Sequence, residues 1–421
     1  MAATPATAAQ ILQIFKEVYG PRIEAQANKS AFMYKEFDKS KQEMAAGKYW
    51  TFPVLDEGGW GAVGSRKDGQ ALPLAQAESP LQATIYPKYH YATIQVSGPA
   101  IAQSKNKALA FIQAKDLEVQ EKTSTLIAML NRQCYNNSGN GLGVELSDGT
   151  KSITFATDTN MNWFRKGMRI EIWDTTLASR RNGTIGTAAQ GLTIDSVNKA
   201  TRTITYSDTD IASSLSATDI VCMEDARLGC TAATNEGAGL TGLLFIIDDV
   251  TDSTAIFQGL SGTTYPIWTG QRLFNSATLR PLSLDLIQTA IDQAEIESGI
   301  PVDFLISGLG QRRNYLNLLW FDARYEPQNF KGGFRVLQYA GGHNSIDWYS
   351  DKDCPRQQVI GLNRGTIKRY EVQPLGILDE MGAGTTRVHG YDLYEVLVGG
   401  YFNLGATRRN CNFRLGDLTE P

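Results

Sequence analysis

The feature that most constrains this chain is the order of its segments in the first third of the sequence. Residues 48–55 and 83–97 have the alternating pattern of two β-strands, and they flank a polar, glycine-rich stretch, GGWGAVGSRKDGQALPLAQAESP. That stretch has too few apolar residues to pack on itself. A helical pattern follows from about residue 102 to residue 136. A long hairpin followed by a long helix predicts a subunit that reaches out to hold its neighbours.

The bulk composition is that of a globular protein. Of the 421 residues, 42% are hydrophobic and 20% are charged, and this length predicts two or three compact units. The 40 Lys and Arg against 44 Asp and Glu leave a formal charge of -4. The chain therefore lacks the basic excess of a dedicated nucleic-acid-binding protein.

The cysteines and the N-terminal residues predict where the chain folds. No pair among the five cysteines has the spacing of a zinc site or a redox motif: Cys134, Cys222, Cys230, Cys354 and Cys411. We expect reduced thiols in a protein that folds in the cytosol. The sequence begins without a secretory signal, and the apolar run at 243–247 is much shorter than the ~20 residues that a membrane span needs. No association with a membrane is expected.

Two changes of pattern divide the middle of the chain. The helical segment carries an apolar stripe that predicts one buried face: Leu109, Ile112, Val119, Leu126, Leu130 and Cys134. From about residue 144 to residue 224 the pattern changes to short alternating runs separated by turn residues. These runs predict a small antiparallel barrel or sandwich, inserted between the helix and the main body.

After residue 239 the pattern mixes helices with strands. Ser283 is expected to cap a helix that ends at Gly299, because a serine hydroxyl suits the first position and glycine suits the last. A buried strand, a second helix and three further strands are then expected at 300–307, 311–321, 346–349, 366–372 and 391–398. A glycine-rich, charged tip at 378–387 separates the last two strands.

No catalytic motif is present. The sequence has no phosphate-binding glycine loop, no Gly-x-Ser-x-Gly elbow and no His-Glu-x-x-His, and its histidines are far apart: His90, His343 and His389. Asp351 and Asp353 have two interpretations, a cation site or a solvated turn. The turn is favoured because little else in that loop could coordinate a cation. We expect no catalytic residue, no metal site and no cofactor.

Three phrases, in this order along the chain, resemble the major capsid protein of tailed bacteriophages: LTGLLFIIDD, RPLSLDLIQTAIDQAEIESGIPVDFLISG and GYDLYEVLVGGYFNLGATRRNCNF. The resemblance implies an α+β fold with a long spine helix, an extended β-hairpin loop, a peripheral β-sheet and an axial α/β domain, here with an inserted antiparallel β-barrel-like domain. It assigns the segments as N-terminal arm, extended loop, peripheral domain with spine helix, inserted β domain, axial domain, and return through the peripheral domain to the C-terminus: 1–46, 47–86, 87–143, 144–226, 227–372 and 373–421.

The resemblance also implies a function and its partners. The chain would self-assemble as pentamers and hexamers into the icosahedral head shell around the double-stranded DNA of a tailed phage, in the host cytoplasm. Family members with a scaffolding leader have a long segment before the arm that this sequence does not show, so a separate scaffolding protein is implied. A portal and a decoration protein are further expected partners. Packaged DNA would be touched only by weak, non-specific contacts, which the near-neutral charge allows.

The resemblance directs attention to seven residues as assembly contacts. Four lie in the loop and three at the charged tip: Trp60, Arg66, Lys67 and Asp68, then Asp379, Glu380 and Arg387. Some family members join subunits through a lysine–asparagine crosslink, and Lys67 lies in the matching loop. The asparagine and glutamate partners find no match in this sequence, so we expect no covalent bond at Lys67.

Two other classes of protein stay open from the sequence. A tail-tube or decoration protein would also belong to a virion, but such proteins are mostly β and the long helix argues against them. An α/β enzyme with a β-domain insertion is the second alternative. The missing motifs and the scarcity of histidine argue against an enzyme.

Overall fold

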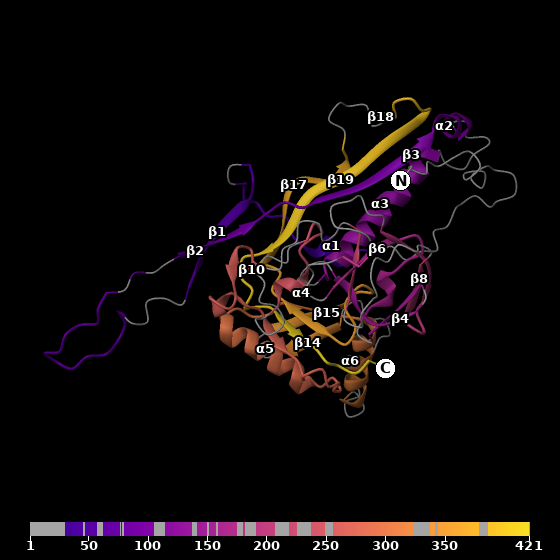
Figure 1. Cartoon of the computed structure of the whole chain (residues 1–421). Helices are drawn as coiled ribbons and strands as arrows, with labels where there is room; N and C mark the ends of the chain where they lie inside the picture. Colours follow the sequence, from indigo (N-terminus) through magenta and orange to yellow (C-terminus); the bar gives the residue numbers. More distant parts are fainter. Residues whose placement is uncertain are drawn as a thin grey trace. The chain divides into compact units, whose positions relative to one another are not determined.

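The computed structural model describes residues 30–44, 47–56, 62–75, 77, 80–104, 114–136, 141–149, 151–156, 159–174, 180–181, 191–206, 219–224, 237–248, 256–322, 337–341, 344–378 and 386–420 (Figure 1). Most of the expected N-terminal arm lies outside these residues. The chain forms two compact units. The first unit draws on Met1–Glu36, Pro87–Arg132 and Glu371–Phe402, and the second on Phe37–Tyr86, Gln133–Tyr370 and Asn403–Pro421.

A four-stranded sheet lies mostly in the first unit, and its longest strand is β19 (Leu393–Ala406). Strand β3 (Tyr89–Ser97) pairs with it in antiparallel fashion, as does the short β18 (Thr386–Arg387), and β17 (Ile367–Ile377) is its other neighbour. Strand β3 buries Ile94 and Val96 on one face and exposes tyrosines on the other. The alternation in the sequence predicts this division of faces.

The expected strand at 83–97 is two strands, and the prediction of a single one was wrong. Strand β2 (Pro80–Ile85) pairs with β1 (Trp50–Leu55), whereas β3 pairs with β19 in a different sheet. Pro87 lies between them. Since proline has no backbone N–H to give to a sheet, it is a natural point for the chain to leave one sheet for another.

Three helices belong wholly or mostly to the first unit: α1 (Met33–Glu36), α2 (Gly98–Ser104) and α3 (Ala114–Gln133). The predicted continuous helix over 102–136 is therefore described as α2 and α3, and residues 105–113 lie outside the described residues. Leu126 and Leu130 on α3 are buried, as the apolar stripe predicts. The backbone N–H of Tyr34 donates to Oδ1 of Asn131 at 3.1 Å and ties α1 to α3.

The predicted barrel is present in the second unit. Six strands close it in the order β4-β5-β8-β7-β6-β9, and they span Gly141–Gly149 (β4), Ser152–Phe155 (β5), Arg169–Trp173 (β6), Leu192–Asn198 (β7), Thr203–Tyr206 (β8) and Ile220–Met223 (β9). All the pairings are antiparallel. Phe155 and Phe164 stack inside it with ring centroids 4.6 Å apart. The 3₁₀ helix η4 (Met161–Trp163) lies between β5 and β6.

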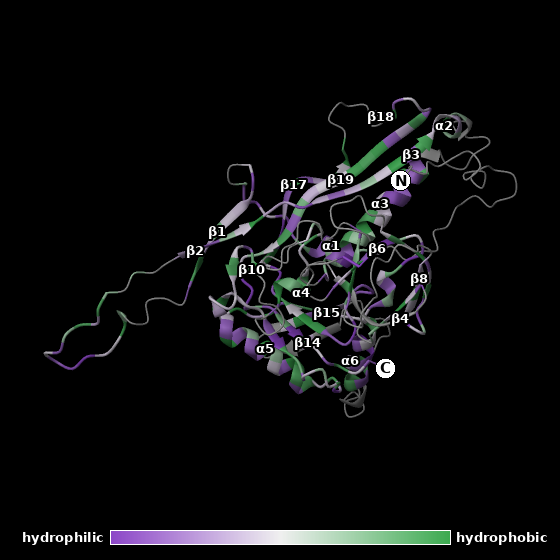
Figure 2. Ribbon diagram, viewed as in Figure 1, coloured by the Kyte–Doolittle hydropathy of each residue, from purple (hydrophilic) through white to green (hydrophobic). Residues whose placement is uncertain are grey.

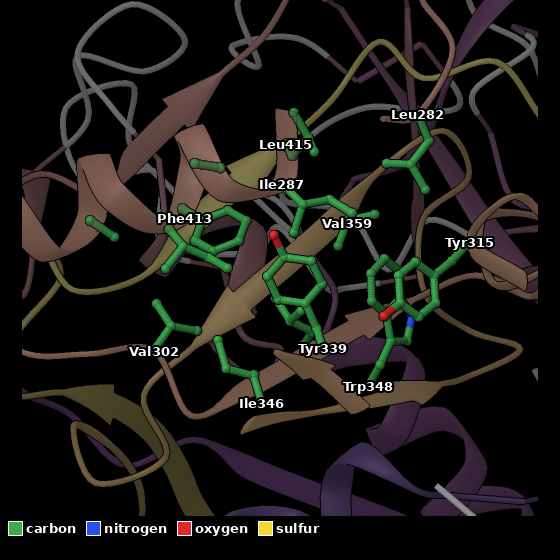
Figure 3. Close-up of a cluster of buried hydrophobic side chains, with 14 of the residues drawn as sticks. Leu282, Ile287, Val302, Tyr315, Tyr339, Ile346, Trp348, Val359, Phe413 and Leu415 are labelled. Carbon is green, nitrogen blue, oxygen red and sulfur yellow. The ribbon is translucent and has the colours of Figure 1, made fainter. Parts of the chain in front are cut away.

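A six-stranded mixed sheet forms the main body of the second unit, in the order β12-β20-β16-β13-β15-β14. Its strands are Gln271–Leu273 (β12), Phe304–Ser307 (β13), Leu337–Gly341 (β14), Asn344–Ser350 (β15), Val359–Leu362 (β16) and Phe413–Leu415 (β20). Figure 3 shows the apolar cluster that joins this sheet to its helices, with Tyr315 against Trp348. Those two rings stack at 4.3 Å.

Helices α5 (Leu284–Ser298) and α6 (Leu309–Asp322) supply the other side of this core. The predicted ends of α5 are confirmed. Oγ of Ser283 accepts from the N–H of Leu286 at 3.2 Å, and Gly299 ends the helix with φ 67°. That left-handed conformation costs glycine little, which explains why the chain can turn there into β13.

Short elements connect the sheet to the rest of the second unit: α4 (Leu243–Ile246), β10 (Ile256–Phe257), β11 (Leu260–Ser261) and η5 (Pro266–Trp268). The buried guanidinium of Arg409 holds two of them together. It donates to the carbonyls of Ile246 and Trp268 at 2.7 Å each. No local pattern predicts this role, because the carbonyls come from segments more than a hundred residues away.

The expected solvated turn at Asp351 and Asp353 was wrong. The two residues are only 4% and 3% exposed. Oδ2 of Asp351 accepts from the hydroxyl of Tyr135 at 3.1 Å, and Oδ1 accepts from the N–H of Asp353 at 3.0 Å. The carboxylate of Asp351, which the sequence analysis expected to be solvated, thus accepts its hydrogen bonds from protein donors. Within the described ranges no group of His, Cys, Asp and Glu could hold a metal ion.

Candidate functional site

The β1–β2 hairpin is fixed at its base by an aromatic cluster. Trp50 lies opposite Ile85 in the ladder, and the two pack with Tyr370. The rings of Trp50 and Tyr370 are 5.5 Å apart between centroids. Burying side chains of this size contributes several kcal/mol in order of magnitude, about 1.5–3 kcal/mol for each large apolar group. The base of the hairpin is therefore a firm support.

Burial falls along the hairpin away from this base. Trp50 at the start of β1 is 1% exposed, whereas Leu55 at its end is 65% exposed. In Figure 1 the described loop residues 62–75 extend well beyond the β1–β2 ladder. A long segment between two strands, as the sequence predicts, is therefore present.

A tight turn lies within the described part of the loop. The N–H of Gln70 donates to the carbonyl of Lys67 at 3.1 Å, and Gly69 between them has φ 76°. The Nε of Arg66 donates to the carbonyl of Ala71 at 3.2 Å, and this hydrogen bond links the two ends of the turn. The structure thus brings Arg66, Lys67 and Asp68 into one turn, and all three are exposed. Trp60, the fourth predicted loop contact, lies outside the described residues.

The loop exposes apolar side chains that the sequence interpretation missed. Val63, Leu72 and Leu74 are 74%, 82% and 87% exposed. Figure 2 shows hydrophilic and hydrophobic stretches alternating along the loop. Large exposed apolar groups on one segment make it a candidate surface for contact with another molecule. The signal was available in the run Ala71-Leu-Pro-Leu74, where leucines recur at every second residue.

The second candidate surface is the hairpin that contains Arg387. This residue lies on β18 opposite Tyr394 of β19. Its guanidinium is 3.8 Å from the carboxylate of Asp392, and both side chains are more than half exposed. The described partner of Arg387 is thus Asp392, which the sequence did not single out. Asp379 and Glu380 lie outside the described residues.

One buried titratable group lies at the start of β3, opposite Gly400 of β19. His90 on β3 is 3% exposed and its ring lies 4.8 Å from that of Phe402. Burial lowers the pKa of His90 to about 4, against a partial rise from its hydrogen bond to the backbone of Phe402, and the charge of Lys88 lowers it further. His90 is therefore a neutral core residue at pH 7.

No helix in the described part of the chain is long and apolar enough to cross a membrane. The cysteines in the described part of the chain are buried: Cys134, Cys222, Cys354 and Cys411. Burial raises the pKa of the Cys354 thiol well above its usual value, with the carboxylates of Asp351 and Asp353 adding to the effect. A buried thiol of raised pKa is a poor nucleophile, so this cysteine is a packing residue.

Comparison with known proteins gives a match of fold alone. No family model matches the sequence, and no curated protein matches it significantly. A chain of the cyanophage A-1(L) capsid asymmetric unit matches the structure with a TM-score of 0.56 and 14% identity, over 96% of this chain and 98% of that chain. The same search finds Gordonia phage Cozz (TM-score 0.47, 9% identity, 98% and 94% coverage) and the holo-SrpI encapsulin complex from Synechococcus elongatus (0.43, 8%, 99% and 96%).

The cyanophage match confirms the predicted fold. It covers 96% of this chain and 98% of that chain. The chain thus has an α+β fold that it shares with a chain of a cyanophage capsid, as its segment order predicts. At 14% identity the match carries the fold and does not by itself assign individual contact residues.

Proposed function

We propose that this chain is a major capsid protein. It assembles as pentamers and hexamers into the icosahedral head shell that encloses the double-stranded DNA of a tailed phage. The observation that carries the proposal is the whole-length match of its fold to a chain of a cyanophage capsid. The role is structural, and no catalytic step is part of it.

The extended loop supports the proposal on physical grounds. Its base is anchored by Trp50, Ile85 and Tyr370, whereas its outer part exposes Leu72 and Leu74. A subunit in a closed ring must present one surface to a different surface of the next copy. A firm base with an apolar outer segment suits such a contact, because the base sets the direction and the segment supplies the apolar area.

The proposed partners follow from this role. The main partner is the chain itself, and a separate scaffolding protein, a portal and a decoration protein are expected to join the assembly. Packaged DNA touches the shell only weakly, which agrees with a formal charge of -4. The place of action is the virion capsid, after assembly in the host cytoplasm.

Assembly of the purified protein tests the proposal. Size-exclusion chromatography with light scattering, followed by negative-stain electron microscopy, should show ring-shaped capsomers or hollow polyhedral particles. Samples with and without a candidate scaffolding protein should be compared over a wide concentration range. A stable monomer under all of these conditions would contradict the proposal.

The same particles test the absence of a crosslink at Lys67. After boiling in detergent they should run as a single band near 46.2 kDa, the mass of the chain. A ladder of higher oligomers that disappears in Lys67→Ala would show that the subunits are covalently joined.

A further inference from the structure

The loop that follows β15 is where the barrel meets the sheet of the second unit. We call residues 351–355 the junction loop. Nδ2 of Asn160 donates to the carbonyls of Lys352 at 2.9 Å and Cys354 at 3.0 Å, and Nε1 of Trp163 donates to the carbonyl of Asp353 at 2.9 Å. Three consecutive carbonyls of the loop therefore each accept from a barrel side chain.

The short helix η4 of the barrel positions the side chains that donate these bonds. Asn160 caps the 3₁₀ helix η4, and its Oδ1 accepts from the N–H of Asn162 at 3.1 Å. That bond fixes the amide so that its two N–H groups face the junction loop. Trp163 is the last residue of the same short helix, and both side chains are buried. One turn of helix thus positions all three N–H donors, two on the amide of Asn160 and one on the indole of Trp163.

The other side of the junction loop is tied to a different segment. Asp351 accepts from the hydroxyl of Tyr135, and its own N–H donates to the carbonyl of Ser307 at the end of β13 at 3.1 Å. Tyr135 follows the last residue of α3 by two positions and is fully buried. Burial raises the pKa of Tyr135 well above its usual value, so its hydroxyl keeps the proton that it donates.

We propose that the junction loop is a lock that fixes the orientation of the barrel on the sheet, and that Tyr135 connects this lock to the segment leaving α3. The loop contacts each part through buried hydrogen bonds. A buried carbonyl that loses its donor is costly, so the bonds favour one arrangement over a range of loose ones. A displacement of residues 133–136 would reach the barrel through Asp351. This inference depends on the contacts within the second unit and holds whether or not the chain forms a shell.

The barrel side of the lock is tested by removing one donor. Trp163→Phe keeps an aromatic ring but loses the indole N–H, and Trp173→Phe is the matched control. Trp173 is also buried in the barrel, but its Nε1 donates to Glu171 within the barrel at 3.1 Å. Hydrogen exchange of unassembled subunits should be at least about tenfold faster at 351–354 in Trp163→Phe and unchanged there in the control.

Barrel orientation is the decisive measurement. Spin labels at Ala200→Cys on the barrel and Gln293→Cys on α5, with Cys230 replaced by Ser, give a distribution of distances between the two parts. Trp163→Phe should widen this distribution at least twofold, while exchange within the barrel strands stays slow. A distribution that stays narrow would overturn the lock, as would equal widening in Trp173→Phe.

Tyr135→Phe tests the connection to α3 separately. It removes one hydroxyl and leaves all three barrel donors in place. We expect faster exchange at 351–354 and a smaller widening of the spin-label distribution than in Trp163→Phe. If the hydrogen exchange at 351–354 and the spin-label distance distribution both match those of the unaltered protein, Tyr135 does not belong to the lock.

Discussion

Replacing two leucines of the loop should weaken assembly without weakening the subunit. Leu72 and Leu74 are 82% and 87% exposed, so the free subunit gains almost nothing from them. Leu72→Ser together with Leu74→Ser should change the free energy of unfolding by no more than about 0.5 kcal/mol, the usual range for surface positions.

The expected cost to assembly is much larger. Full burial of a leucine side chain contributes about 1.5–3 kcal/mol, so two leucines covered by a neighbour contribute about 3–6 kcal/mol for each subunit. Since about 1.4 kcal/mol corresponds to a factor of ten, the concentration at which particles form should rise about a hundredfold or more. Light scattering against protein concentration measures this threshold, and urea unfolding measures the stability of the subunit.

Two single variants place this result in context. Trp60→Ala should also raise the threshold strongly, because this aromatic residue stands between glycines in the sequence and we expect a neighbouring subunit to cover it. Lys67→Ala should have a much smaller effect, since exposed charges mainly set register. An unchanged threshold in the double leucine variant would refute the reasoning, and so would an equal loss in Lys67→Ala.

Three further predictions concern pH, the charged tip and the barrel. The pKa of His90 falls from its ordinary 6.5 to about 4 on folding, so the free energy of unfolding should be highest above about pH 6.5 and decrease toward pH 4, by about 2 kcal/mol at pH 5. Urea unfolding at a series of pH values should show this decrease in the unaltered protein and not in His90→Gln. The same pH dependence in both proteins would contradict the assignment. Arg387→Glu should reduce the yield of closed particles with an unchanged melting temperature, since its exposed pair with Asp392 contributes only about 0–1 kcal/mol; normal yield would remove Arg387 from the interface. Replacing residues 144–226 with a short Gly/Ser bridge should leave a folded body that melts at a lower temperature, because the junction loop loses its barrel donors; circular dichroism showing an unfolded body would mean that the barrel is no separate domain.

Local signals in the sequence predicted much of the fold. The cap at Ser283 and the stop at Gly299 depend on neighbours within a few residues, so the ends of α5 could be read directly. The barrel strands could also be predicted from the sequence, because alternation of apolar and polar residues is a property of each strand alone. The split between β2 and β3 was missed because both strands alternate in the same way and only their partners differ.

The burial of polar groups was decided by tertiary structure. Asp351 resembles a turn residue in sequence, yet it accepts a hydrogen bond from Tyr135, which lies 216 positions earlier. Arg409 likewise finds its acceptors 163 and 141 positions away, at Ile246 and Trp268. The sequence by itself determined the order of the elements and the ends of α5, because those depend on short-range spacing. Which charges lie in water and which lie inside was determined only when distant segments met, since the free energy of a buried polar group depends on the partner that it finds there.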